Sequence, residues 1–257
     1  QNGMRYPVDL VKALATENLL RKDVLYITVS QNDDGWVARC SEMKQLLENY
    51  QITILSAGGY GHVPIPLLKQ PEPIPKKLYP RQELVSYVGS SRHAPGQMRQ
   101  KLVNRMKKDW EQYRNKYYHG EDWRNVMAQS KFSLCPRGFG RTSYHVMETL
   151  QMGLVPVQIY MDRPWLPYKN LLHNVSYAVT LRELPLLLKN LSEVSDDQHA
   201  RMEQYIEQLR DEYFTFDGTL RQIEKFMVNP GTSELVCESL PKYSGTRHRE
   251  PKPCIKR

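Results

Sequence analysis

The sequence has no apolar run long enough to cross a bilayer, so we expect no membrane-spanning helix in this chain. It has only four cysteines, and none of them has the spacing of a zinc-ligand pair. No secretory leader, internal repeat or low-complexity tract is visible. These absences argue against a helical membrane protein, a zinc module and a repeat array.

Acidic residues are fewer than basic ones: the chain has 28 aspartates and glutamates and 36 lysines and arginines, which gives a net charge of +8. A basic protein attracts acidic partners, among them nucleic acid and nucleotide diphosphates. The basic residues form no long block, and residues 105–108 have the spacing of a solvated helix face. No DNA- or RNA-binding motif is visible, so we expect no nucleic-acid partner.

The most informative segment is 132–157, which the pattern predicts as strand, glycine loop, helix, glycine stop and strand. The loop opens onto a helix N-terminus, where backbone N–H groups and the helix dipole favour an anion. Its glycines permit unusual backbone angles and close approach, and its arginines offer forked donors to phosphate. Thr142 or Ser143 can serve as the N-cap. The residues predicted to bind a phosphate-bearing ligand are Arg137, Gly138, Gly140, Arg141, Thr142 and Ser143.

Glu148 lies about one turn into the helix that this loop opens. A carboxylate there can accept hydrogen bonds from the two hydroxyls of a ribose. The alternative is that Glu148 caps the first turn or pairs with a surface lysine. Because loop, arginines and acid occur in one strand–turn–helix unit, the pattern favours a sugar-nucleotide site.

The rest of the chain predicts two small parallel α/β units. Prolines between residues 64 and 80 indicate an extended linker. We place an acceptor-side unit at 1–75, a nucleotide-sugar unit at 76–228 and a tail at 229–257 that packs back on the first unit. Ligands of parallel sheets bind beyond the carboxyl ends of the strands. A cleft between the units would bring together four strand-end loops, at 31–36, 56–62, 89–96 and 137–143.

Segment 132–157 resembles the signature of the exostosin family, glycosyltransferase family 47. In that signature a C-P-R-G or C-P-S-G strand end precedes a serine, a helical glutamate and a V-P-V strand. The matching residues are Cys135, Pro136, Arg137, Gly138, Ser143, Glu148, Leu150, Gly153, Pro156 and Val157. Residues 165–168 resemble the family's W-x-L-P-F, and 84–102 and 61–66 are similar to its upstream strand–loop–helix and D-V-x-I-P segments.

This resemblance implies a GT-B fold, in which two Rossmann-like units face each other across a cleft and the C-terminal segment crosses back. It also implies inverting transfer from a nucleotide sugar to a glycan or glycoprotein, without a cofactor or a catalytic metal. The sequence agrees on the metal, because it has no D-x-D triplet. It departs from the family at His145, where many members have arginine, and at Gly61–His62, where an aspartate is replaced.

Inverting transfer needs a base for the acceptor hydroxyl and cations for the departing diphosphate. Asp33, Asp34 and His62 are the candidate bases, although either aspartate could instead cap the next helix. Arg92 and Arg99 join the loop arginines as candidate donor ligands, and Arg99 could instead face solvent. Trp36 and Tyr60 are candidates to stack on the acceptor.

The donor is expected to be a UDP-sugar, with xylose favoured because a pentose needs no room for a hydroxymethyl group. The alternatives are an inactive nucleotide-sugar or glycan-binding protein and, below it, a nucleic-acid-binding protein. The compact length resembles short exostosin-like enzymes of algal viruses, which predicts the cytoplasm of a host cell. The other location is the Golgi lumen, with an anchor removed. Cys237 and Cys254 could pair in an oxidising compartment, and the sequence leaves this open.

Overall fold

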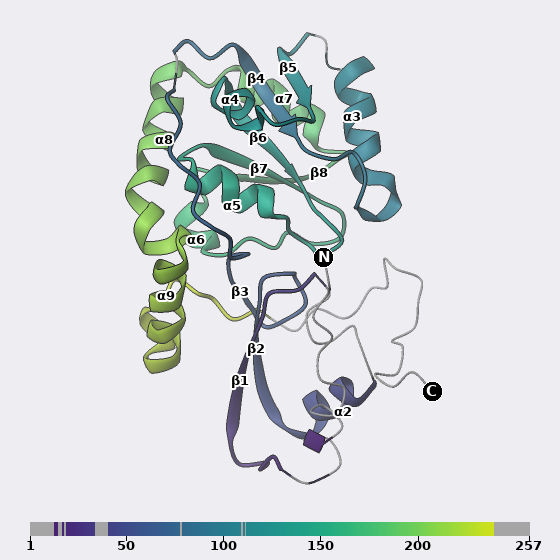
Figure 1. The fold of residues 1–257 in the computed structure, drawn as a ribbon, viewed down its shortest axis with the longest axis vertical. Helices are drawn as coiled ribbons and strands as arrows, with labels where there is room; N and C mark the ends of the chain where they lie inside the picture. The colour runs from purple at the N-terminus through teal and green to yellow at the C-terminus, as the bar shows by residue number, and fades with distance from the viewer. Residues whose placement is uncertain are drawn as a thin grey trace.

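The computed structural model describes residues 13–14, 17, 19–33, 41–77, 79–108, 110 and 112–238, without the side chains of 41–44. These residues form two parallel β-sheets in two α/β units, which lie end to end in an elongated molecule (Figure 1). The α/β class and the two-unit, GT-B type arrangement are therefore confirmed. Within the described ranges, every helix is too short or too polar to cross a membrane.

The first unit is built on a three-stranded sheet, ordered β1-β2-β3. Its elements are β1 (Leu25–Ser30), α2 (Ser41–Asn49), β2 (Gln51–Ser56) and β3 (Val63–Pro64). β1 and β2 pair in parallel from Leu25↔Gln51 to Ser30↔Ser56. β1 is an edge strand, and its apolar residues Leu25, Ile27 and Val29 are exposed. Proline at the end of β3 fits its place at the other edge, because proline cannot donate to a ladder.

The second unit is built on a five-stranded parallel sheet, ordered β5-β4-β6-β7-β8. Its strands are β4 (Glu83–Val88), β5 (Asn115–Tyr118), β6 (Ser130–Pro136), β7 (Val155–Tyr160) and β8 (Tyr177–Thr180). β4, β6 and β7 are almost entirely buried, as expected for parallel strands that are covered on both faces. Cys135 in β6 is a buried thiol, and burial raises its pKa to about 12, which fits a small core residue.

Helices cover both faces of this sheet (Figure 1). From β4 the chain moves to β5 on one side, and from β6 it moves to β7 on the other. Right-handed crossovers therefore place α3 on one face and α5 on the opposite face. The remaining helices are η1 (Pro95–Gln97), α3 (Met98–Lys108), α4 (Trp123–Ala128), α5 (Tyr144–Gln151), α6 (Lys169–Leu172), α7 (Leu184–Ser192), α8 (Asp196–Leu209), η2 (Arg210–Phe214), α9 (Phe216–Val228) and η3 (Pro230–Thr232).

One hydrophobic core runs through both units, because Leu55, Val63 and Ile65 belong to the same cluster of buried residues as sheet β4–β8. After α9 the chain crosses back: Leu235 joins that core, and the backbone N–H of Glu238 donates to the carbonyl of His62 at 2.5 Å. The domain limits at 75/76 and 228/229 stay predictions. Cys254 lies outside the described residues, so its pairing with Cys237 stays open.

The linker between the units is held along the second unit by a series of side-chain contacts. Lys77 Nζ donates to Glu207 at 2.5 Å and to the carbonyl of Gly153 at 2.6 Å. Arg81, which is fully buried, donates to both carboxylate oxygens of Glu203 at 2.7 Å, and Tyr79 donates to the same carboxylate. The segment predicted as an extended linker is therefore fixed in place on the surface of α8.

Candidate functional site

The strand order of the second unit marks where a ligand should bind. The chain leaves β4 toward one edge and β6 toward the other, which makes the carboxyl ends of these two neighbours a topological switch point. The loops that leave it are 89–96 and 137–143, two of the four that the sequence predicts at the site. Gly89 begins the first of them with φ 122°, a backbone angle that favours glycine.

Loops of the first unit pack directly on loop 137–143. The backbone N–H of Arg141 donates to the carbonyl of Gly58 at 2.7 Å. A Cβ on Gly140 would lie 2.6 Å from that carbonyl oxygen and 3.0 Å from that of Asp33. Gly140 therefore makes room for backbone of the first unit, and its part in donor binding stays a prediction. Neither Gly138 nor Gly140 has a positive φ, so the loop does not depend on left-handed angles at these positions.

Arg137 and Arg141 are buried and share one acidic partner, Asp162. Arg137 donates from Nη1 to Asp162 Oδ1 at 2.9 Å, and from its other nitrogens to the carbonyls of Phe139 and Gly140. Arg141 donates to Asp162 Oδ2 at 2.7 Å and to the carbonyl of Gly59 at 2.7 Å. These contacts shape the loop and join it to the first unit. Phosphate binding by either arginine stays a prediction.

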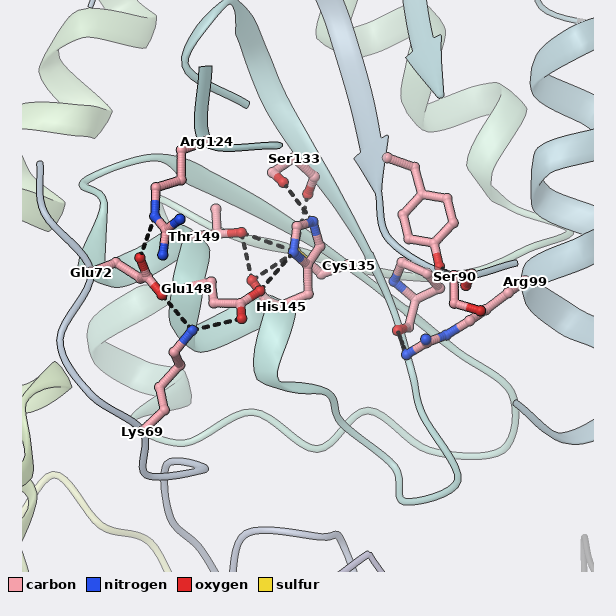
Figure 2. A network of polar contacts seen from close by, with 12 residues as sticks. Lys69, Glu72, Ser90, Arg99, Arg124, Ser133, Cys135, His145, Glu148 and Thr149 are labelled. Carbon is pink, nitrogen blue, oxygen red and sulfur yellow. Dashed lines mark hydrogen bonds and ion pairs between the residues drawn. The ribbon is translucent and has the colours of Figure 1, made fainter. Parts of the chain in front are cut away.

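The two other predicted arginines come after β4: Arg92 lies in loop 89–96, and Arg99 lies near the start of α3. Arg99, near the start of α3, donates from Nε to the carbonyl of Arg137 at 3.0 Å and from Nη2 to that of Pro136 at 3.3 Å. Its guanidinium therefore points toward the end of β6 and not into solvent (Figure 2). Arg92 is exposed, and its backbone N–H donates to Ser90 Oγ at 3.1 Å. Of the two, Arg99 is the cation that the fold holds beside loop 137–143.

Ser143 occupies the N-cap position of α5, but its side chain makes no capping hydrogen bond. The residue is 7% exposed, and its Oγ is buried without a hydrogen-bond partner. Thr142 is buried beside it, and its carbonyl accepts from the N–H of Gly138 at 2.9 Å. A buried hydroxyl without a partner is unfavourable in a folded protein. Ser143 Oγ is therefore an unsatisfied group at the N-terminus of α5, and anion binding there stays a prediction.

Glu148 lies one turn into α5, and both of its carboxylate oxygens have partners (Figure 2). Lys69 Nζ donates to Oε1 at 2.7 Å, and His145 Nδ1 lies 3.2 Å from Oε2. Since a carboxylate only accepts, His145 Nδ1 must carry the hydrogen. In the neutral ring Nε2 then accepts from Ser133 Oγ at 3.1 Å. Glu148 thus pairs with a lysine, as the alternative interpretation expects. This lysine is half-buried and comes from the linker, whereas the alternative expected a lysine at the surface.

The electrostatics keep the acids of the site ionised. Burial alone would raise the pKa of Glu148, but the hydrogen bond from His145 and the cation of Lys69 outweigh it and lower the pKa to about 2. For Asp162, burial again acts upward, and the hydrogen bonds and charges of Arg141 and Arg137 lower its pKa overall. Both groups are therefore anionic at neutral pH: a lysine of the linker holds Glu148, and two arginines of loop 137–143 hold Asp162.

The candidate base residues are only partly described. Asp33 is exposed at the end of β1, with its backbone against Gly140. Asp34 lies outside the described residues. His62 Nδ1 accepts from the backbone N–H of Ile54 at 2.9 Å, and burial lowers its pKa. That bond occupies the one lone pair of the neutral ring, which argues against His62 as the base.

The acceptor candidates give a similar result. Tyr60 is buried, and the guanidinium of Arg141 lies over its ring at 4.4 Å. A covered ring is poorly placed to stack on a sugar, which argues against the expected role. Trp36 lies outside the described residues.

Comparison with known families identifies the family of this chain. A model of the Exostosin GT47 domain matches residues 53–215, which include both loops, Glu148 and the linker. The chain belongs to the exostosin GT47 family. The resemblance read from segment 132–157 is thereby confirmed.

Individual relatives of this exostosin-family chain are distant. Two Arabidopsis thaliana proteins, each named a probable glycosyltransferase, are 29% identical over 51% of this chain and 28% identical over 42% of it. The matches span only 28% and 21% of those proteins' own lengths. The crystal structure of the GtfA/B complex covers 79% of this chain and 45% of its own, with 12% identity and a TM-score of 0.44, a likeness too weak to support an argument.

Sequence reasoning missed two residues of the exostosin-family site. Asp162 lies two residues after buried β7, and an acid at the carboxyl end of a parallel strand is a signal that could have identified it. Lys69 has no such signal, because its partner Glu148 is 79 positions away. In the described part of the chain, no three His, Cys, Asp or Glu side chains are grouped to hold a metal ion.

Proposed function

We propose that this exostosin-family chain transfers a sugar from a UDP-sugar to a hydroxyl of a glycan, with inversion at the anomeric carbon. The diphosphate binds at the N-terminus of α5, and the ribose hydroxyls bind Glu148. Family membership supports sugar transfer, and the switch point between β4 and β6 supports this location.

The observation that carries the proposal is the buried hydroxyl of Ser143. It has no partner at the start of a helix whose first N–H groups and dipole attract negative charge. A diphosphate oxygen would supply the missing acceptor. Glu148, one turn further along α5, is ionised and 21% exposed, so it offers the acceptor that a ribose hydroxyl needs.

Departure of the UDP product leaves negative charge that the site must stabilise. In this proposal the N-terminus of α5 and Arg99 do so without a metal, because Arg99 is held next to the same loop. Asp33 is the base that takes the proton of the acceptor hydroxyl, since the strand-end loop that carries it faces loop 137–143. We keep xylose as the proposed sugar, for its lack of a hydroxymethyl group.

The binding step is tested by titrating UDP into wild-type protein and Ser143→Ala by calorimetry. Loss of a hydrogen bond to a charged group weakens binding by about 1.5–3 kcal/mol, roughly a tenfold to hundredfold rise in Kd. The Ser143 hydroxyl has no partner in the free protein, so Ser143→Ala should unfold at an unchanged or higher temperature.

Ser195→Ala is the matched control. Ser195 also caps a helix, α8, but its Oγ accepts from the N–H of Gln198 at 3.2 Å. This variant should lose about 1 kcal/mol of stability and bind UDP like wild type. Unchanged UDP affinity in Ser143→Ala would contradict the proposed site.

The chemical step needs a separate assay. UDP-xylose and a glycan acceptor should give product in the presence of EDTA, and Asp33→Asn should lower kcat while UDP affinity is kept. UDP binding without turnover of any UDP-sugar would favour a binding protein. Activity lost in EDTA and restored by manganese would overturn the metal-independent mechanism.

A further inference from the structure

Lys69 belongs to the linker between the units and yet bonds the acid of the proposed donor site. Its Nζ lies 2.7 Å from Glu148 Oε1 and 2.6 Å from Glu72 Oε1, so one ammonium bridges two carboxylates (Figure 2). Only 19% of its side chain is exposed, and the ammonium also lies 5.7 Å from the centre of the Trp123 ring. An ammonium with this many contacts is restricted in its motion.

The second carboxylate anchors Lys69 to the body of the protein. Glu72 is 4% exposed, and its Oε2 accepts from Arg124 Nε at 2.6 Å. Its backbone N–H donates to Gln151 Oε1 at 3.2 Å, and its carbonyl accepts from Arg210 at 2.9 Å. Glu72 is thus tied to three helical segments of the second unit, and Lys69 has a fixed position from which to hold Glu148.

On its other side Glu148 meets His145, which is itself fixed by Ser133 in buried β6. Hydrogen bonds link Ser133 to His145 and His145 to Glu148, as in the serine–histidine–acid triad of hydrolases. Ser133 is 2% exposed in the middle of a strand, so no substrate can reach it. The hydrogen bonds therefore orient Glu148 from both sides. Each carboxylate oxygen has about two acceptor positions, so one on each oxygen remains for a ligand.

We propose that Lys69 is a positioning residue, which holds the Glu148 carboxylate in the orientation that accepts the two ribose hydroxyls of the nucleotide. This inference rests on the proposed function and assigns the linker a direct part in donor recognition. Without Lys69 the carboxylate keeps only His145, and its Oε1 is free to rotate away from the ribose.

The test compares UDP with 2′,3′-dideoxy-UDP, which lacks both ribose hydroxyls. Wild-type protein should bind UDP at least about tenfold more tightly, the value expected for hydrogen bonds to a carboxylate. Lys69→Met should remove this preference, while its affinity for dideoxy-UDP stays at the wild-type value. Lys69→Arg keeps a cation within reach of both acids and should restore most of the preference.

Lys77→Met is the matched control, since Lys77 is a linker lysine that pairs with Glu207 and not with Glu148. It should retain the full preference for UDP. If Lys69→Met does not fold, Lys69→Gln, which keeps a hydrogen-bond donor without the charge, is measured in its place and should lose the preference.

The dependence of the ribose preference on pH gives a second readout. The ionised Glu148 of wild type keeps the UDP preference constant between pH 8 and 5, because the pKa of that carboxyl is about 2. The groups that face it are Lys69, His145 and buried Cys135, and loss of the lysine removes a cation whose hydrogen bond and charge lower this pKa. In Lys69→Gln any remaining preference should therefore fall at a higher pH.

The outcomes separate the two proposals. Full ribose preference in Lys69→Met, or its loss in Lys77→Met as well, overturns the positioning role and leaves the proposed function intact. Glu148→Gln with wild-type UDP affinity and ribose preference overturns the donor site itself.

Discussion

The two sheets of this molecule differ in how much of them is covered. In the first unit, edge strand β1 exposes Leu25, Ile27 and Val29, whereas strands β6 and β7 of the second unit are buried on both faces. The larger sheet can therefore hold a loop and a helix N-terminus in fixed positions. The smaller one is held against it through glycine contacts, a shared core and the returning tail. The second unit therefore fixes the positions of the side chains in the proposed donor site, and the first unit contributes loops that pack against it.

The strongest way to test this contrast is to break one ion pair in each unit. Glu203→Ala leaves buried Arg81 without its carboxylate, and loss of one partner of a buried pair costs about 3–5 kcal/mol. Asp23→Asn breaks the Arg21–Asp23 pair, whose side chains are 72% and 68% exposed, and should leave stability unchanged. Urea unfolding of both variants measures the difference. Equal effects would show that the two units are equally well packed.

A smaller effect is expected where the units touch. Gly140→Ala places a Cβ 2.6 Å from the carbonyl oxygen of Gly58, and overpacking of this kind costs about 1–3 kcal/mol. In Gly138→Ala the nearest atom to the new Cβ is 3.4 Å away, and φ is not positive. Only Gly140→Ala should lower the midpoint of urea unfolding. If Gly138→Ala lowers the unfolding midpoint more than Gly140→Ala does, the contact between the units is not the reason for glycine at position 140.

The smallest expected effect is a dependence of stability on pH. His199 of the second unit is fully buried beside Glu203, Arg81 and the carbonyl of Lys131, and burial lowers its pKa. The unfolded chain therefore binds more protons, so stability is complete above the unfolded pKa of about 6.5 and falls as the pH drops below it. The slope for one proton is at most about 1.4 kcal/mol per pH unit.

His62 of the first unit, only half-buried, has its pKa lowered in the same direction. Unfolding of His199→Gln and His62→Gln between pH 7.5 and 5.5 tests which histidine matters. His199→Gln should flatten the dependence more than His62→Gln does, and the reverse order would contradict the greater burial of the second unit.

Local pattern was sufficient to predict much of this fold. Segment 132–157 forms the predicted strand, loop, helix and strand, and Gly153 ends the helix region with φ 66°. Beyond this segment, α3 ends at Lys108, and the side-chain amide of Asn115 donates to the carbonyls of Trp110 and Tyr113 in the stretch that follows.

The candidate site was less accessible to sequence reasoning. The family signature singles out Ser143 and Glu148, because their proposed roles depend on positions close together in one loop and helix. The signature does not show that Asp162 forms ion pairs with Arg137 and Arg141, or that Lys69 pairs with Glu148. Such pairings depend on how distant segments come together. The sequence therefore predicted phosphate binding by Arg137 and Arg141 but gave no sign of their contacts within the loop.

The chain's passage between the units is very short. Gln31 of the first unit accepts from the N–H of Leu68 at 2.9 Å and donates to the carbonyl of Pro66 at 3.1 Å. The next residue, Lys69, is already bonded to the second unit. Apart from the returning tail, this is the covalent connection between two bodies that also share one core. The connection adjoins the ammonium that holds Glu148, so any shift of the first unit would act directly on the acid of the proposed donor site.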